Sequence, residues 1–292
     1  MINTALRPSQ KSYTQHFQHS TLPAFKSTMS TPNYSDVLAN TQVLVLGGSS
    51  GIGFCVAEHA LSQGAIVTIS SSRQSKLDEA VNRLKASFPD FAHNVYGCVC
   101  DLSNIESTRP NLEARLKHVT RKQPLDHIVF TAGDSIQIKP VSELDIETIQ
   151  RLGNVRFLAP MLLGGLAKPY LKSSKTSSIT LTSGVNVTKP GKAWTTVAGY
   201  GAGTEGVARG LAVDLAPVRV NTVSPGAVHT ELFDDFGGAR LEEILASFRK
   251  RTLTGAVGTP QELSEAYIYL MRCTFATGSL IEVNGGALLA GS

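Results

Sequence analysis

From Thr41 onward, short apolar runs alternate with longer stretches in which apolar residues recur every three to four positions. The short runs are typical of buried strands, and the longer spacing is typical of amphipathic helices. The pattern predicts strands at 42–47, 65–70, 95–100, 125–131, 177–182, 218–223 and 279–283. It predicts helices near 52–63, 75–87, 105–121, 143–171, 196–215, 231–250 and 260–272.

Apolar strands separated by helices indicate a parallel sheet that is covered on both faces. Right-handed crossovers then give a doubly wound, Rossmann-type α/β fold of about seven strands. From Thr41 onward the sequence shows no internal repeat and no linker long enough to divide the domain. We therefore expect a single domain over residues 39–292.

Residues 1–38 have a different composition, rich in Ser, Thr, Gln, Asn and Pro, with no acidic residue before Asp36. Such an arm resembles an organellar transit peptide, but it shows no strong amphipathic helix that carries arginine. We expect a disordered extension on a cytoplasmic protein, with Met29 as an alternative start and organellar import as the less favoured reading.

Composition narrows the function. Of the 292 residues, 42% are hydrophobic and only 17% are charged, which argues against a disordered or nucleic-acid-wrapping protein. Part of the net charge of +4 lies in the N-terminal arm, so the net charge says little about the function. The four cysteines lack Cys-x-x-Cys spacing, the histidines lack metal-ligand spacing, and no apolar run approaches membrane-spanning length. These features favour a small-molecule substrate and no metal, nucleic acid or membrane span.

A glycine-rich turn follows the first predicted strand and opens the first helix, with glycines at 47, 48, 51 and 53. Backbone N–H groups at a helix N-terminus bind anions, and glycine lets a pyrophosphate approach the backbone closely. The predicted cofactor contacts of this turn are Gly47, Ser49, Ser50, Gly51, Ile52 and Gly53.

The second strand ends in Ser71, Ser72 and Arg73, and no acidic residue occurs between Gly64 and Leu77. An acidic side chain at this edge would accept hydrogen bonds from the ribose hydroxyls of NAD, whereas serine and arginine donate to a 2′-phosphate. We therefore predict NADP(H), bound through Ser72 and Arg73. The alternative is that Arg73 is a surface residue at a helix start.

The turn Gly-x-x-x-Gly-Ile-Gly resembles that of the short-chain dehydrogenase/reductase family, with Leu46 where the family has threonine. The resemblance extends over about 41–287. It implies further cofactor contacts at Asp101, Leu102, Ala132, Gly133, Pro225, Gly226, Val228 and Thr230. Asp101 could instead cap the next helix, a role that Ser103 or Asn104 fits equally well. Thr131 and Phe130 replace two family asparagines that brace neighbouring strands, so this bracing is expected to be lost.

The same resemblance implies catalytic roles for Ser183, which would orient the substrate, Tyr200, which would donate the proton, and Asn154, which would relay protons. The gap between Ser183 and Tyr200 is longer than usual for the family. Thr204 stands where a lysine would lower the pKa of the phenol. Without that lysine, a tyrosine can donate in reduction but serves poorly as a base in oxidation. Alternatively, Tyr200 lines a pocket without taking part in chemistry.

Either Lys192 or Arg156 could supply the missing positive charge, although loop residues Lys189 and Lys192 are more simply read as solvated. The catalytic stretch resembles a divergent, largely fungal branch of the family, in which some members act in secondary metabolism and a few guide cyclisations. We expect an NADP(H)-dependent oxidoreductase that reduces a carbonyl or related group on a small apolar molecule. The alternatives are a non-redox cyclase or isomerase that retains NADP, and a cofactor-binding protein without turnover. Family members imply a homodimer or homotetramer.

Overall fold

The computed structural model describes residues 37–231, 233 and 238–291. These residues form a seven-stranded sheet in which every neighbouring pair of strands is parallel. The strands are β1 (Gln42–Leu46), β2 (Ile66–Ser71), β3 (Val95–Val99), β4 (His127–Phe130), β5 (Ser178–Thr182), β6 (Arg219–Pro225) and β7 (Leu280–Val283). Their order is β3-β2-β1-β4-β5-β6-β7, which confirms the predicted doubly wound fold.

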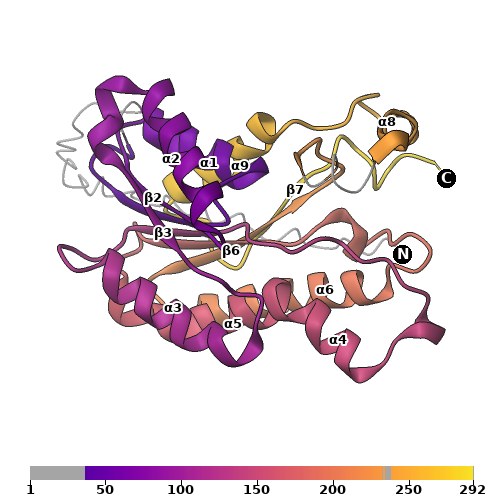
Figure 1. Cartoon of the computed structure of the whole chain (residues 1–292), viewed down its shortest axis with the longest axis horizontal. Helices are drawn as coiled ribbons and strands as arrows, with labels where there is room; N and C mark the ends of the chain where they lie inside the picture. Colours follow the sequence, from indigo (N-terminus) through magenta and orange to yellow (C-terminus); the bar gives the residue numbers. More distant parts are fainter. Residues whose placement is uncertain (1–36, 232, 234–237, 292) are drawn as a thin grey trace, which may run out of the picture. The chain divides into compact units, whose positions relative to one another are not determined.

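Helices cover both faces of the sheet (Figure 1). One face carries α1 (Gly51–Ser62), α2 (Gln74–Ser87) and α9 (Pro260–Arg272), which share one buried apolar cluster. The other carries α3 (Ile105–Val119), α5 (Ala159–Ala167) and α6 (Thr195–Asp214), which share a second cluster. The inner strands β1, β4, β5 and β6 are buried on both faces, whereas the edge strands β3 and β7 are partly exposed.

Two long predicted helices are divided in the structure. The segment predicted at 143–171 contains α4 (Ile146–Gly153), a π-helical turn at Asn154–Leu158, and then α5. Such turns change which side chains face a neighbouring element, and they are frequent at functional sites. The segment predicted at 231–250 contains a 3₁₀ turn (Gly238–Arg240) and α8 (Leu241–Lys250), while 232 and 234–237 lie outside the described residues.

The N-terminal extension predicted at 1–38 lies almost wholly outside the described residues. Leu38 is described, and it is only 1% exposed within the cluster that contains α1 and α9. The folded region therefore includes Leu38, which the sequence had assigned to the extension. In the part of the chain that the structure describes, no helix combines the length and apolar character needed to cross a membrane.

The order of the strands reverses between β1 and β4, and this reversal determines where the site lies. The chain leaves β1 toward β2 on one side, and β4 lies on the other side of β1. Ligands of open α/β sheets bind at such a switch point, beyond the carboxyl ends of the strands. The predicted glycine turn, the end of β4 and the end of β5 all lie along this edge.

Candidate functional site

A cleft of about 770 Å³ lies along the carboxyl ends of the strands. This volume is within the roughly 300–1,000 Å³ typical of small-molecule sites. Every cofactor residue predicted from the sequence lines it: Gly47, Ser49, Ser50, Gly51, Ile52, Gly53, Ser72, Arg73, Asp101, Leu102, Ala132, Gly133, Pro225, Gly226, Val228 and Thr230. Of the three predicted catalytic residues, Ser183 lines the cleft, whereas Tyr200 and Asn154 do not.

The glycine turn depends on the absence of side chains at two positions. Gly47 has a φ of +86°, and a Cβ there would lie 2.5 Å from the backbone nitrogen of Ala132. A Cβ on Gly53 would overlap the carbonyl oxygen of Gly47 and the hydroxyl of Thr131. The turn can therefore pack directly against the end of β4 and leave its backbone open to the cleft.

Thr131 replaces the lost asparagine brace. Its Oγ1 lies 3.1 Å from the carbonyl oxygen of Leu46 and 3.3 Å from that of Gly47, and can donate to either. The expectation that bracing is lost at this position is therefore wrong, because a hydroxyl can join β1 to β4 where the family uses an amide.

The end of the cleft beside β2 is basic. Ser72, Arg73 and Lys76 line it, and Lys76 was not anticipated from the sequence. Asp101 is not the cap of α3, because the side chain of Asn104 accepts from the backbone N–H groups of Glu106 and Ser107. Three donor side chains at the β2 edge, with no acidic residue directly after the strand, are suited to a phosphate group.

An acidic side chain contacts the helix N-terminus at the glycine turn. The backbone N–H of Gly51 donates to Oε2 of Glu231 at 2.9 Å, and Glu231 also lines the cleft. The contact shows that this amide is available to an anionic oxygen, which is the property that a pyrophosphate requires.

Replacing Glu231 by glutamine should tighten the binding of NADP⁺ by roughly two- to fivefold, because an anion no longer competes at the N-terminus of α1. Calorimetric titration at low ionic strength measures the change, and added salt should reduce it. Glu106→Gln is the control, since Glu106 lies in the first turn of α3 and does not line the cleft. Unchanged or weaker binding by Glu231→Gln would show that the carboxylate does not compete with the cofactor.

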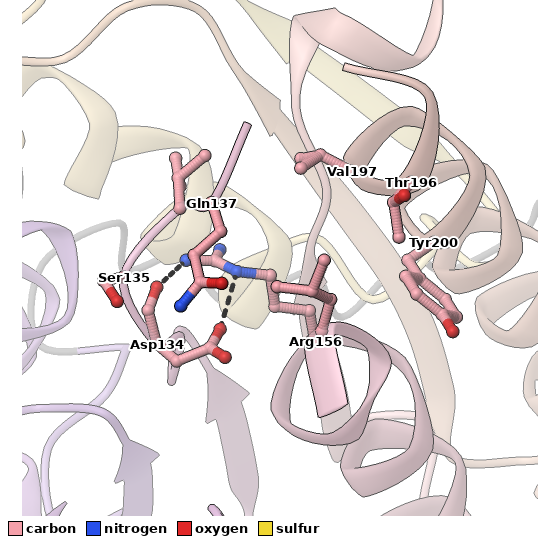
Figure 2. Close-up of a pocket in the computed structure, with 9 residues that line it drawn as sticks. Asp134, Ser135, Gln137, Arg156, Thr196, Val197 and Tyr200 are labelled. Atoms are coloured by element: carbon pink, nitrogen blue, oxygen red, sulfur yellow. Dashed lines mark hydrogen bonds and ion pairs between the residues drawn. The ribbon is translucent and has the colours of Figure 1, made fainter. Parts of the chain in front are cut away.

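Arg156 brings a charged group from the π-helical turn into the cleft. Its Nε donates to Oδ1 of Asp134 at 3.1 Å, its Nη2 donates to the carbonyl oxygen of Asp134, and its guanidinium lies against Gly133. Figure 2 shows the guanidinium reaching across to Asp134. Burial lowers the pKa of Arg156, but an arginine starts so high that it stays charged.

Tyr200 does not line this cleft, but it lines a small separate pocket together with Arg156 and Asp134 (Figure 2). Its hydroxyl donates to the carbonyl oxygen of Ile149 on α4 at 2.7 Å, and its ring packs on Gly153 and Phe157. Figure 2 shows the hydroxyl directed away from Arg156 and Asp134. Burial raises the pKa of this phenol, which is opposite to the shift expected for a catalytic base. Tyr200 therefore ties α6 to α4 and is not brought together with Ser183.

Asn154 begins the π-helical turn, at the point where the resemblance implied a kinked helix. Its side chain is only 2% exposed, and its Nδ2 donates to the carbonyl oxygen of Leu102 at 2.7 Å. The amide thus joins the turn after β3 to the helical layer, and the structure does not bring it to the cleft.

The face of α6 that lines the cleft carries Val197, Gly201 and Thr204. The Thr204 hydroxyl lies 2.9 Å from the carbonyl oxygen of Arg156 and 3.0 Å from that of Tyr200, so it holds the π-helical turn against α6. Ser183, at the end of β5, donates to Oε1 of Glu205 on α6 at 2.9 Å. Among the described residues, α6 thus presents neither a phenol nor an ammonium group to the cleft.

Comparison with known proteins agrees with this geometry. Residues 34–290 match the family model described as an SDR-like Rossmann domain. The short-chain dehydrogenase/reductase malC of Malbranchea aurantiaca is 42% identical over 256 residues, covering 87% of this chain and 97% of the relative. The chain is a short-chain dehydrogenase/reductase.

Two other similarities extend the comparison. The short-chain dehydrogenase/reductase fsr5 of Gibberella fujikuroi is 37% identical, covering 88% of this chain and 98% of the relative. The solved structure of the Malbranchea aurantiaca protein, described as MalC reductase/Diels-Alderase, matches with a TM-score of 0.83 and covers 87% of this chain and 98% of that one. A small-chain dehydrogenase in complex with NADPH is 25% identical with a TM-score of 0.70, covering 86% of this chain and all of the other.

The family has a tyrosine and a lysine four residues apart on this helix. On α6, the two residues with this spacing that line the cleft are Val197 and Gly201. The resemblance implied Tyr200 because it is the tyrosine that follows Ser183, and the long gap between the two residues is the signal against that assignment. Four other residues were missed or misread: Lys76, Asp134, Glu205 and Lys189. Lys189 lines the cleft and donates to the carbonyl oxygens of Ala287 and Ala290, so it is not a solvated loop residue.

Replacing Tyr200 by phenylalanine in this dehydrogenase/reductase should leave the rate of NADPH-dependent reduction within about threefold. It should lower the free energy of unfolding by about 0.5–1.5 kcal/mol, because the hydrogen bond to Ile149 is lost. Steady-state kinetics and urea unfolding measure the two effects. A tenfold or larger loss of kcat with unchanged stability would return Tyr200 to the catalytic set.

Proposed function

We propose that the chain is an NADP(H)-dependent reductase of a carbonyl or related unsaturated group on a small, largely apolar molecule made in secondary metabolism. The observation that carries this proposal is a single cleft that runs from the glycine turn and the basic β2 edge to Ser183 and Arg156. This arrangement supports a ligand path along which an anion site, a 2′-phosphate site and a charged reaction end would follow one another.

The residues at the β2 edge fit NADP(H) better than NAD(H). Arg73 and Lys76 can both pair with a 2′-phosphate, and Ser72 can donate to it. The Gly51 amide already donates to a carboxylate oxygen, so the glycine turn can hold the pyrophosphate. When bound, the nicotinamide cofactor supplies the hydride.

At the other end of the cleft the protein would position the substrate and stabilise charge. Arg156 is ion-paired with Asp134, which engages its Nε and Nη2 groups. Its other N–H donors and the guanidinium charge, which Asp134 partly offsets, suit an oxyanion that develops as a carbonyl is reduced. Because an arginine does not give up its proton and, among the described residues, α6 presents no phenol to the cleft, we propose that the proton comes from water. Trp194, Val197 and Phe248 also line the cleft and favour an apolar substrate body.

Stopped-flow measurement of NADPH oxidation against a panel of aromatic and alicyclic ketones, aldehydes and imines tests this proposal. Saturable oxidation with at least one member supports reductase activity. NADPH binding without oxidation of any member would contradict it.

A second candidate is a non-redox cyclase or isomerase that retains NADP. It is favoured by Val197 and Gly201, because among the described residues α6 presents neither a tyrosine nor a lysine to the cleft. The related protein described as a reductase/Diels-Alderase combines the two kinds of activity in its name. Formation of a product without consumption of NADPH would favour this candidate, and cofactor binding without any product would favour a protein without turnover.

We also propose that the protein forms a homodimer or homotetramer in the cytoplasm, through the helices within 105–171 and 196–215. The support is the family membership, since short-chain dehydrogenase/reductases commonly assemble through these helices. Light scattering of the purified protein tests the oligomeric state, and a monomer at micromolar concentration would contradict it.

A further inference from the structure

Ser183 is held between the last residues of β5 and a carboxylate on α6. Its backbone N–H donates to the carbonyl oxygen of Val223 at 2.9 Å, which fixes the main chain beside β6. Its hydroxyl donates to Oε1 of Glu205 at 2.9 Å. A carboxylate can only accept hydrogen bonds, so the single hydroxyl proton of Ser183 is directed at Glu205.

This direction changes what Ser183 offers to a ligand. A hydroxyl has one proton and two lone pairs. With the proton on the side of Glu205, the lone pairs of the oxygen are what remain for a molecule in the cleft that Ser183 lines. A serine in this state can accept a hydrogen bond from a substrate but cannot polarise a bare carbonyl oxygen.

Within the described part of the chain, the Glu205 carboxylate interacts with Ser183. Among the described residues, Ser183 is the hydrogen-bond partner that the structure gives to the side chain of Glu205, which is half-buried. The nearby Thr204 hydroxyl is engaged by backbone carbonyl oxygens, and Val197 and Gly201 carry no polar side chain. The Ser183–Glu205 pair is therefore a polar feature of the α6 side of the cleft that the catalytic resemblance does not explain.

We propose that Glu205 is a positioning residue that fixes Ser183 as a hydrogen-bond acceptor, so that the substrate presents an N–H or O–H donor beside the group to be reduced. The proposal rests on the proposed function for the identity of the reaction. It assigns recognition of the substrate donor to Ser183, and it leaves stabilisation of a developing negative charge to Arg156 on the facing π-helical turn.

The test compares two ligands that differ in one donor, 2-naphthol and 2-methoxynaphthalene, bound to the protein saturated with NADP⁺. Both have the same aromatic body, and only the naphthol can donate. Calorimetric titration should show that 2-naphthol binds about three- to tenfold more tightly, the value of one hydrogen bond. In Ser183→Ala the two ligands should bind equally.

Glu205→Gln provides the decisive variant, because an amide can donate to the Ser183 oxygen and release its proton toward the cleft. The preference for 2-naphthol should fall to about one in this variant, while Glu147→Gln on α4, which does not line the cleft, should retain it. The readout is a ratio of two affinities, so a general loss of stability or affinity does not change it. Ser183→Ala gives an independent answer if Glu205→Gln does not fold.

Equal binding of the two ligands to the unaltered protein, tighter binding of the ether, or no detectable binding of 2-naphthol at millimolar concentration would overturn the proposal. So would a naphthol preference that survives in both Ser183→Ala and Glu205→Gln. Failure of the proposed function is seen separately, as absence of NADPH oxidation with every carbonyl compound. The naphthol ratio can still be measured in that case.

Discussion

Replacing Arg156 by methionine should lower kcat for NADPH-dependent reduction by about 100- to 1,000-fold, the usual cost of losing one donor to a developing oxyanion. Methionine keeps much of the length of the side chain but removes the charge that Arg156 brings into the cleft. Steady-state kinetics should show a much smaller change in KM, because the lost interaction strengthens as charge develops.

Two cations provide the controls for Arg156. Arg151→Met removes a guanidinium from α4 that donates to Gln137, and Lys192→Met removes the other cation considered from the sequence. Neither residue lines the cleft, so both variants should keep kcat within about twofold. An Arg156→Met enzyme with the unaltered rate would show that the charge has no role in the chemistry.

Replacing Gly47 by alanine should destabilise the fold by about 3 kcal/mol and weaken NADP⁺ binding by more than about tenfold. The φ of +86° costs an alanine roughly 1–2 kcal/mol. Its Cβ, 2.5 Å from the Ala132 nitrogen, would add roughly 1–3 kcal/mol of overpacking that only backbone movement could relieve. Thermal unfolding should show a midpoint lower by about 6–12 °C.

Gly210→Ala on α6 is the matched control for Gly47→Ala. An alanine Cβ at Gly210 would meet no atom within 4 Å, and alanine is the better helix former by about 1 kcal/mol. This variant should therefore be as stable as the unaltered protein or slightly more stable. Equal behaviour of the two alanine variants would show that the glycine turn is not constrained as described.

The sheet and the cofactor end of the cleft could be predicted from the sequence because both depend on short, contiguous stretches of residues. Apolar runs predict each strand, and the residues that follow β1, β2, β4 and β6 lie at one edge once the strands are parallel. The pattern of a buried strand and a glycine turn leaves few alternatives for the backbone.

The reaction end was less predictable because it depends on helix rotation. The π-helical turn at Asn154–Leu158 interrupts the regular spacing and brings Arg156, rather than Asn154, to the cleft. On α6, the choice among Val197, Tyr200 and Gly201 depends on the packing of the helix against α4 and β5 rather than on residue type. The Ser183–Glu205 contact joins two elements, and no local spacing predicts it.

Calorimetric titration of the purified protein with NADP⁺, NADPH and NAD⁺, repeated on Arg73→Met, tests the central claim most directly. The account predicts saturable heat for both NADP forms at micromolar to submillimolar concentration, and at least about tenfold weaker binding of NAD⁺. Arg73→Met should lose most of that preference, because Arg73 lines the cleft where the 2′-phosphate would lie. No heat of binding with NADP⁺ or NADPH at millimolar concentration would contradict the account.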